Sequence, residues 1–76
     1  MEESTFVKQI NEYRWRNGNG RTPLSMERTA EKFGVSRIAL SSWLMGRGTP
    51  TLKNAVRVAS VLGISLDELV GHEVPV

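Results

Sequence analysis

The 76-residue sequence predicts an all-α fold, a compact domain of five helices that occupies residues 1–76. Three observations lead to this prediction. Apolar side chains recur every three or four residues, as they do on one face of a helix. Serine or threonine stands at each of the five positions where a helix would begin, and glycine follows most of the predicted helix ends. No segment alternates apolar and polar residues between hairpin turns, so we expect no sheet.

The first helix is predicted over Thr5–Arg16. Ser4 or Thr5 can cap it, because a side-chain oxygen there accepts a hydrogen bond from an otherwise unpaired backbone N–H. Helical spacing gives this segment one apolar stripe of Phe6, Ile10 and Tyr13. Trp15 lies off the stripe and is expected to pack against the loop that follows. That loop, residues 17–23, contains two glycines and is predicted as a flexible connection.

Residues 24–50 carry almost all of the functional information, because two short helices meet at a glycine within residues 25–45. The first is predicted over Met26–Phe33 and the second over residues 36–45. Gly34 ends the first helix, since the tight turn requires a positive φ. The expected caps are Ser25 and Ser36. The side chains expected to face the core are Ala30, Phe33, Val35, Leu40 and Trp43, with Leu44 at the edge.

Two further helices complete the predicted domain. The fourth is expected over Leu52–Leu62, behind a Thr51 cap, and ends at Gly63. Its expected inner face consists of Leu52, Ala55, Val58, Ala59 and Leu62. The run from Ser65 to Glu68 is a capping box, which starts a short fifth helix with Leu66 and Leu69 facing inward. Residues 71–76 are expected to form a flexible tail.

The helix predicted over residues 36–45 presents an unusual outward face, formed by Arg37, Ile38, Ser41 and Ser42. Solvent-exposed helix faces usually hold Glu and Lys, which are good helix formers. Serine and β-branched isoleucine favour helices less, so contact with a partner explains their presence better than exposure to solvent does. A helix held by one face, with a polar opposite face, suits insertion into a DNA groove.

Basic residues are concentrated in the middle of the chain. Residues 4–66 contain all ten Lys and Arg residues but three of the eight acidic residues, a net charge of +7, while the two ends carry −5. No acidic residue lies between Lys32 and Leu66. Such a segment favours a polyanionic partner, because Lys and Arg release condensed counterions from phosphates. An ordinary solvated surface is an equally good interpretation of the charge alone.

The ordered set of motifs resembles the helix-turn-helix of the phage repressor and Cro family, the XRE-type regulators. The resemblance covers roughly residues 10–69. It is carried by Leu24-Ser25 with Glu27 and Ala30, the turn Gly34-Val35-Ser36, the loop Gly46-Arg47 with Pro50, and the last two helices over residues 52–69. It implies a repressor-like five-helix domain that acts as a sequence-specific regulator of transcription on double-stranded DNA, most simply a repressor.

The resemblance also implies a contact map on DNA. The helix over residues 36–45 would lie in the major groove. Base contacts are then expected from Arg37, Ile38, Ser41 and Ser42, and phosphate contacts from Ser25, Met26, Ser36, Arg47, Thr49, Thr51 and Lys53. Three alternatives stay open. Arg37 could clamp a phosphate, Ile38 could be partly covered by Leu24 or the preceding helix, and the basic loop could be mobile and hydrated.

Three positions depart from the family pattern. Met26 stands where glutamine is frequent, so its side chain cannot make a polar phosphate contact. Leu44 stands where glutamate often pairs with an arginine of the first helix. Arg14 or Arg16 is therefore expected to be solvated, to pair with another acid, or to touch DNA. The loop over residues 17–23 is several residues longer than usual. It is either a tolerated insertion or an arm that reaches the DNA backbone.

Other classes of function find little support. The sequence has no cysteine and one histidine, His72, so we expect no metal, no cofactor and no Ser/His catalysis. No membrane span, secretory signal or effector pocket is expected, which favours the cytoplasm of a bacterium or a phage host, with the protein at the nucleoid.

A weak homodimer on a palindromic operator is expected. Its expected contact surface consists of Val56, Val61 and residues 66–76, although single exposed valines are also common. The alternative function is a protein-binding module such as a toxin-neutralising antitoxin.

Overall fold

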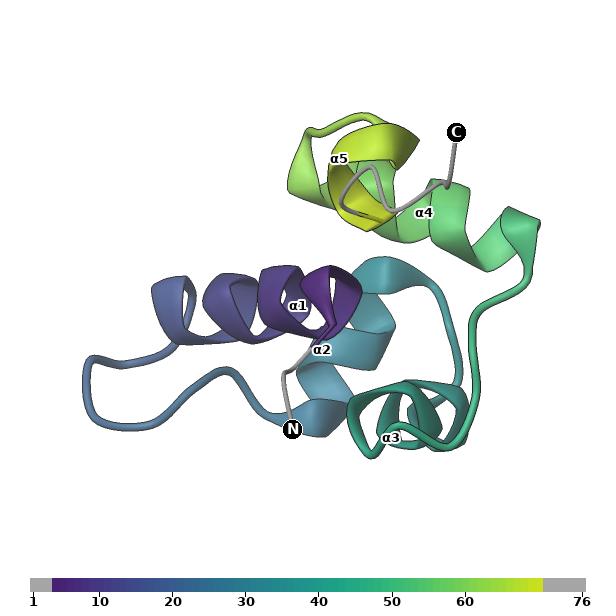
Figure 1. Ribbon diagram of the computed structural model, residues 1–76. Coiled ribbons are helices and arrows are strands. Elements are labelled where there is room, and N and C mark those ends of the chain that lie inside the picture. Colours follow the sequence, from purple (N-terminus) through teal and green to yellow (C-terminus); the bar gives the residue numbers. More distant parts are fainter. Residues whose placement is uncertain (1–3, 71–76) are drawn as a thin grey trace.

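The computed structural model describes residues 4–70, which contain five helices and no strand (Figure 1). In chain order the helices are α1 (Thr5–Arg16), α2 (Met26–Phe33), α3 (Arg37–Leu44), α4 (Leu52–Leu62) and α5 (Leu66–Val70). The all-α prediction is therefore confirmed, and four of the helices have the predicted bounds to within one residue. The tail predicted over residues 71–76 lies outside the described residues.

Side-chain caps set where the first four helices begin. Each cap oxygen accepts a hydrogen bond from the backbone N–H three residues further on, as in the pair Ser36 and Ala39 at 3.0 Å. The other pairs are Ser4 with Val7 at 3.2 Å, Ser25 with Arg28 at 3.1 Å, and Thr51 with Asn54 at 3.2 Å. At α5, Ser65 accepts from the N–H of Glu68 at 3.1 Å, and its hydroxyl donates to the Glu68 carboxylate at 3.4 Å. These bonds satisfy N–H groups that have no partner within their helix.

A single hydrophobic core joins all five helices. Its buried members are Ile10, Ala30, Phe33, Leu40, Trp43, Ala55, Val58, Ala59 and Leu69. Two ring contacts bring α1 onto the next two helices. Phe6 meets Trp43 edge to face with centroids 5.6 Å apart, and Tyr13 meets Phe33 at 5.3 Å. The predicted apolar stripe of α1 is therefore the face that packs, and it holds α2 and α3 in place.

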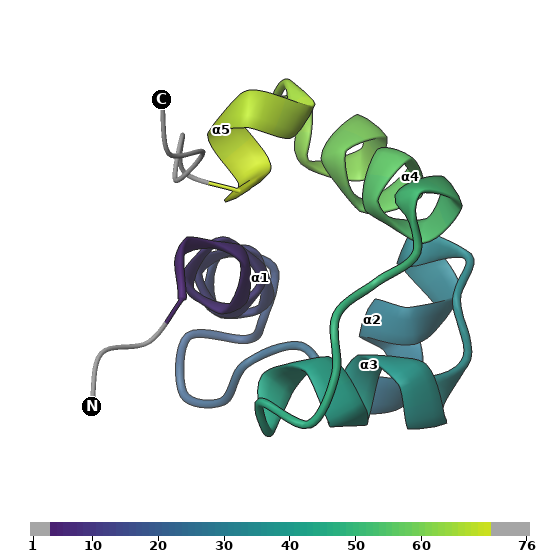
Figure 2. The ribbon, with the colours of Figure 1, turned by 45° about the vertical axis from the view of Figure 1, so that its right-hand side comes forward.

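The helices pack around this core in pairs. α2 packs on α3 and α4, while α5 packs on α1 and α4. Figure 2 shows α1 beneath α5 on one side and α2 on the other, with α3 lying across the bottom of the domain. Because only its upper side meets the other helices, α3 is left with a long face towards solvent.

Two expectations about side chains are wrong. Leu52 was expected inside, but it is 73% exposed. It is the first residue of α4, and there it borders an open hollow of about 620 Å³ with Pro50 and Phe6 among the lining residues. A first-turn residue lies beyond the stretch that the core covers, so the 3.6-residue period misplaces it. Trp15 is 56% exposed at the end of α1, so the loop does not bury it.

Candidate nucleic-acid interface

The inner edge of α3 is fixed by two buried side chains. Leu40 is fully buried and Trp43 is 5% exposed. Ala39 and Leu44 are half-buried and pack against the same core. The Ser36 cap fixes the start of the helix, and the backbone N–H of Arg47 donates to the carbonyl of Ser42 at 2.8 Å just after its end. One side of α3 is therefore held along its length.

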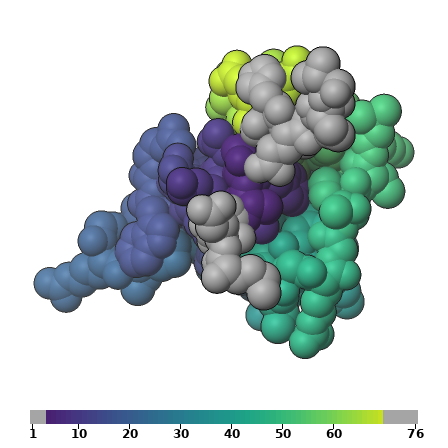
Figure 3. All heavy atoms as spheres, viewed as in Figure 1, coloured from purple at the N-terminus to yellow at the C-terminus, as the bar shows by residue number. Residues whose placement is uncertain are grey.

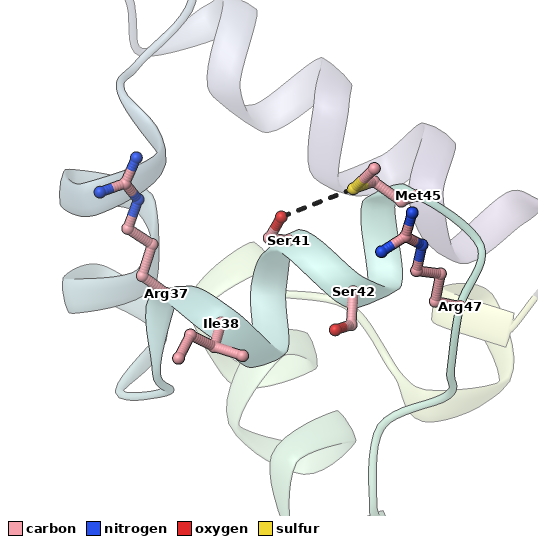
Figure 4. Close-up of a pocket in the computed structure, with 6 residues that line it drawn as sticks. All are labelled: Arg37, Ile38, Ser41, Ser42, Met45 and Arg47. Atoms are coloured by element: carbon pink, nitrogen blue, oxygen red, sulfur yellow. Dashed lines mark hydrogen bonds between the residues drawn. The ribbon is translucent and has the colours of Figure 1, made fainter.

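The outer edge of α3 faces solvent and forms a shallow depression of about 410 Å³. Its lining residues are Arg37, Ile38, Ser41, Ser42, Met45 and Arg47. Figure 4 shows the two arginines at opposite ends of the helix, with the smaller side chains between them. All four residues predicted to contact bases thus lie together. The same surface includes Arg47, which was predicted to contact a phosphate.

Apolar side chains on this surface are unusually exposed. Ile38 is 80% exposed and Met45 is 61% exposed. The exposure of Ile38 overturns the alternative in which Leu24 or α2 covers it. Met45 was not predicted as a site residue. It lies one helical turn beyond Ser41, whose hydroxyl approaches the Met45 sulfur at 3.8 Å (Figure 4). That i, i+4 spacing was the signal that could have identified Met45.

The residues predicted to contact phosphates lie at helix starts and in exposed loops. Three of them, Ser25, Ser36 and Thr51, already accept a backbone N–H as helix caps. A hydroxyl that accepts can still donate its own hydrogen, so each retains one donor for a phosphate oxygen. Arg47, Thr49 and Lys53 are exposed, whereas Met26 is half-buried against the core and offers its backbone alone.

The starts of α2 and α4 differ in charge. Glu27 and Arg28 lie in the first turn of α2 and offset each other in charge, whereas the first turn of α4 contains no acid and carries Lys53. The unpaired N–H groups and the dipole favour an anion at either end, but a carboxylate in the first turn opposes it. The start of α4 is therefore the better phosphate site of the two.

An arginine of α4 holds the turn between α2 and α3. Gly34 has φ 71°, which closes α2 in the left-handed conformation as predicted. Its carbonyl oxygen accepts a hydrogen bond from Nη1 of Arg57 at 2.8 Å. Sequence reasoning missed this contact, because it joins residues 23 positions apart. This hydrogen bond links α4 to the turn between α2 and α3. Because that turn sets the direction of α3, Arg57 positions α3 although it lies on another helix.

Arg14 has a role that was not among those expected for it. Its Nε donates to the carbonyl oxygen of Leu24 at 2.9 Å, and the N–H of Leu24 donates back to the carbonyl of Arg14 at 2.7 Å. Arg14 is half-buried and joins the end of α1 to the chain just before α2. Leu44, which replaces the usual acidic partner, packs against the core.

Within residues 4–70, no three His, Cys, Asp or Glu side chains are grouped closely enough to hold a metal ion. None of the helices described is long and apolar enough to cross a membrane. His72 lies outside the described residues.

Two short helices joined at a left-handed glycine, the second exposed along a polar and basic face, define the class of DNA-binding helix-turn-helix domains. A family model described as "Helix-turn-helix" matches residues 24–69, well over half of the chain. The chain therefore belongs to the helix-turn-helix family, of the XRE type, whose members regulate transcription and are not typically enzymes.

Two curated proteins are similar to the chain. It is 40% identical over 43 residues to the cryptic phage CTXphi transcriptional repressor RstR of Vibrio cholerae, an alignment covering 57% of the chain and 38% of that protein. It is 34% identical over 50 residues to the HTH-type transcriptional activator BcrR of Enterococcus faecalis, covering 66% of the chain and 24% of that protein. The chain thus matches less than half the length of either relative. No solved structure matches it significantly.

Proposed function

We propose that this chain binds double-stranded DNA in a sequence-specific manner and represses transcription. The observation that carries the proposal is the exposure of α3. An eight-residue helix keeps Leu40 and Trp43 buried while Ile38, on the other edge, is 80% exposed beside Arg37. Exposing an isoleucine gains nothing in water, but the side chain suits the methyl group of thymine in a major groove.

Each outer residue of α3 has a chemical role in this proposal. Arg37, at the first position of the helix, can donate two hydrogen bonds to O6 and N7 of guanine. Ile38 and Met45 supply apolar contact with thymine methyl groups. Ser41 and Ser42 are half-buried and offer short donors or acceptors that allow the helix to approach the base edges closely.

The flanking residues supply affinity without reading sequence. Arg47, Thr49 and Lys53, with the cap of α4 at Thr51, would bind phosphates on one side of the groove. Ser25, Met26 and Ser36 would bind through backbone N–H groups and hydroxyls at the starts of α2 and α3. The net charge of +7 over residues 4–66 supports attraction of the domain to the duplex.

Repression rather than activation is proposed from the similarity to RstR, whose alignment with this chain has the higher identity. We propose a homodimer on a palindromic operator, because one helix reads few base pairs and two half-sites one helical turn apart read more. Val56 and Val61, which are 48% and 38% exposed on α4, are the proposed contact surface within the described residues. No enzymatic activity and no effector form part of the proposal, and the bacterial cytoplasm is the proposed compartment.

Selection of bound fragments from random duplexes tests the proposal. We expect a consensus with inverted-repeat symmetry and an affinity that falls steeply with salt, as phosphate contacts require. Sedimentation should show two chains per selected duplex. Retention that is weak, blind to sequence and nearly independent of salt would contradict the proposal, and would favour a protein-binding module such as an antitoxin.

A further inference from the structure

The connection between α1 and α2 is a structured turn rather than a slack tether. The side-chain oxygen of Asn19 accepts from the N–H of Arg21 at 2.9 Å, the N–H of Thr22 at 2.8 Å and the Thr22 hydroxyl at 3.2 Å. The N–H of Asn19 donates in return to the carbonyl of Thr22 at 3.2 Å. Asparagine closes turns in this way by replacing backbone acceptors with its own oxygen.

The turn is also closed at its base. A Cβ at Gly18 would collide with the carbonyl oxygen of Thr22, so the two sides of the turn approach more closely than any other residue allows. The reciprocal hydrogen bonds between Arg14 and Leu24 fix both ends of the turn to the domain. The flexible connection expected from the two glycines is therefore replaced by a hydrogen-bonded projection.

This projection carries one positive charge and no acidic residue of its own. Arg21 is exposed, and it is the only charged residue between positions 17 and 26. It lies four positions before Ser25, the cap of α2, so the two Cα atoms lie at most about 14 Å apart. Figures 1 and 2 both show the turn level with α3, on the side away from α5, and Figure 3 shows it standing out from the rest of the surface.

We propose that this turn is a preformed second anchor on the DNA backbone, in which Arg21 binds a phosphate outside the stretch that α3 reads. The inference rests on the proposed DNA binding and deepens it. A phosphate suits the position, because it needs a positive charge and no sequence-dependent geometry. The Asn19 hydrogen bonds order the turn before binding, so the contact forms without the entropy loss of ordering a free loop.

The test uses the full chain and its selected duplex. Arg21→Gln removes the charge and keeps most of the side-chain length. It should reduce the slope of log affinity against log salt by about 0.9. Between 50 and 200 mM salt, wild type should therefore lose about 3.5-fold more affinity than the variant. Base preference should stay the same. A variant with the wild-type slope overturns the proposal.

Lys8→Gln is the matched control, because Lys8 is exposed on α1 and has no assigned DNA contact. It should keep the wild-type slope. An equal fall in both variants would show an effect of net charge and would also overturn the proposal. Asn19→Ala keeps every charge but removes the acceptor of the turn. It should weaken binding by about fivefold without changing the slope, because the turn must then be ordered on binding. If Asn19→Ala binds the selected duplex with wild-type affinity, the proposal that the anchor is preformed is overturned.

Neutralising single phosphates of the duplex as methylphosphonates locates the contact. Wild type should lose affinity at one phosphate beyond the bases that α3 reads, and Arg21→Gln should be insensitive to that same change. Loss of equal size in both proteins at every phosphate would overturn the proposal. The outcomes separate the two levels of inference. A wild-type chain that selects no duplex contradicts the proposed function, whereas normal selection with unaltered Arg21→Gln behaviour contradicts this inference alone.

Discussion

The two edges of α3 should respond to mutation in opposite ways. Leu40 and Ile38 are aliphatic residues two positions apart on one helix, but the first is fully buried and the second is 80% exposed. Replacing each with alanine therefore changes the same kind of side chain in two environments. We expect Leu40→Ala to affect folding and Ile38→Ala to affect DNA binding.

The burial of each side chain sets the expected loss of stability. Truncating a buried leucine costs about 2–5 kcal/mol. For a domain of this size that lowers Tm by at least about 8 °C. Burying a whole isoleucine contributes about 1.5–3 kcal/mol, so the covered fifth of Ile38 contributes about 0.3–0.6 kcal/mol. The better helix propensity of alanine offsets most of that. The stability of Ile38→Ala should therefore lie near that of wild type.

DNA binding should show the reverse order. Ile38→Ala removes three carbons, so a fully buried contact would be worth at most about 2.4 kcal/mol at 0.8 kcal/mol per carbon. A contact with one thymine methyl covers part of this, and we expect a loss of about 1 kcal/mol, or about fivefold in Kd. Fluorescence anisotropy on the selected duplex and thermal unfolding by circular dichroism measure the two effects.

The reasoning fails if Ile38→Ala unfolds as readily as Leu40→Ala, because Ile38 would then be part of the core. It fails equally if Ile38→Ala binds the selected duplex as tightly as wild type. Binding by Leu40→Ala is measured below its own Tm, where the folded fraction should retain the wild-type base preference.

Five further variants test individual residues. Arg37→Ala should relax base preference at one position per half-site by about 1–3 kcal/mol in a random-duplex selection. Arg47→Ala should instead weaken binding to all sequences alike and reduce the slope of log affinity against log salt by about one. The contact map is contradicted if the two variants show each other's outcome. Gly34→Ala should lower the free energy of unfolding in urea by about 1–2 kcal/mol, because the φ of 71° at this position strains any residue with a Cβ. An unchanged free energy of unfolding would mean that the turn adapts to the side chain. Arg57→Ala should lower the free energy of unfolding by about 1 kcal/mol, because it removes the hydrogen bond to the Gly34 carbonyl. Arg57→Lys should restore little of this stability, since a lysine ammonium differs from a guanidinium in reach and hydrogen-bond geometry.

Local chemistry explains why most of the fold could be predicted. The caps Ser4, Ser25, Ser36 and Thr51 act within three residues of themselves, so the sequence alone identifies them. Helical periodicity likewise identifies the buried faces, because a residue such as Leu40 follows its neighbours at fixed angles. The same reasoning placed the four proposed base-contacting residues of α3 on one surface, where the structure has them.

Contacts between distant residues could not be predicted in this way. Arg57 reaches the Gly34 carbonyl only because α4 packs on α2. Arg14 binds the carbonyl of Leu24, and backbone carbonyls carry no signature in the sequence. Leu52 fits the apolar period of α4, but the core does not extend to the first turn of that helix, so the side chain is exposed. The asparagine and glycines of residues 17–23 predicted a loop, but its hydrogen bonds depend on how α1 and α2 fix its ends.

The central claim is that the outer edge of α3 lies against the bases of DNA, and a thiol placed on that edge tests it most directly. The chain has no cysteine, so Ser42→Cys introduces a single reactive group, and Glu12→Cys on α1 provides an exposed control outside both the proposed DNA interface and the proposed dimer surface. We predict that saturating selected duplex slows alkylation of Ser42→Cys at least about tenfold while leaving Glu12→Cys unchanged, since a major-groove contact excludes the reagent. Equal alkylation of Ser42→Cys with and without bound duplex would contradict the account.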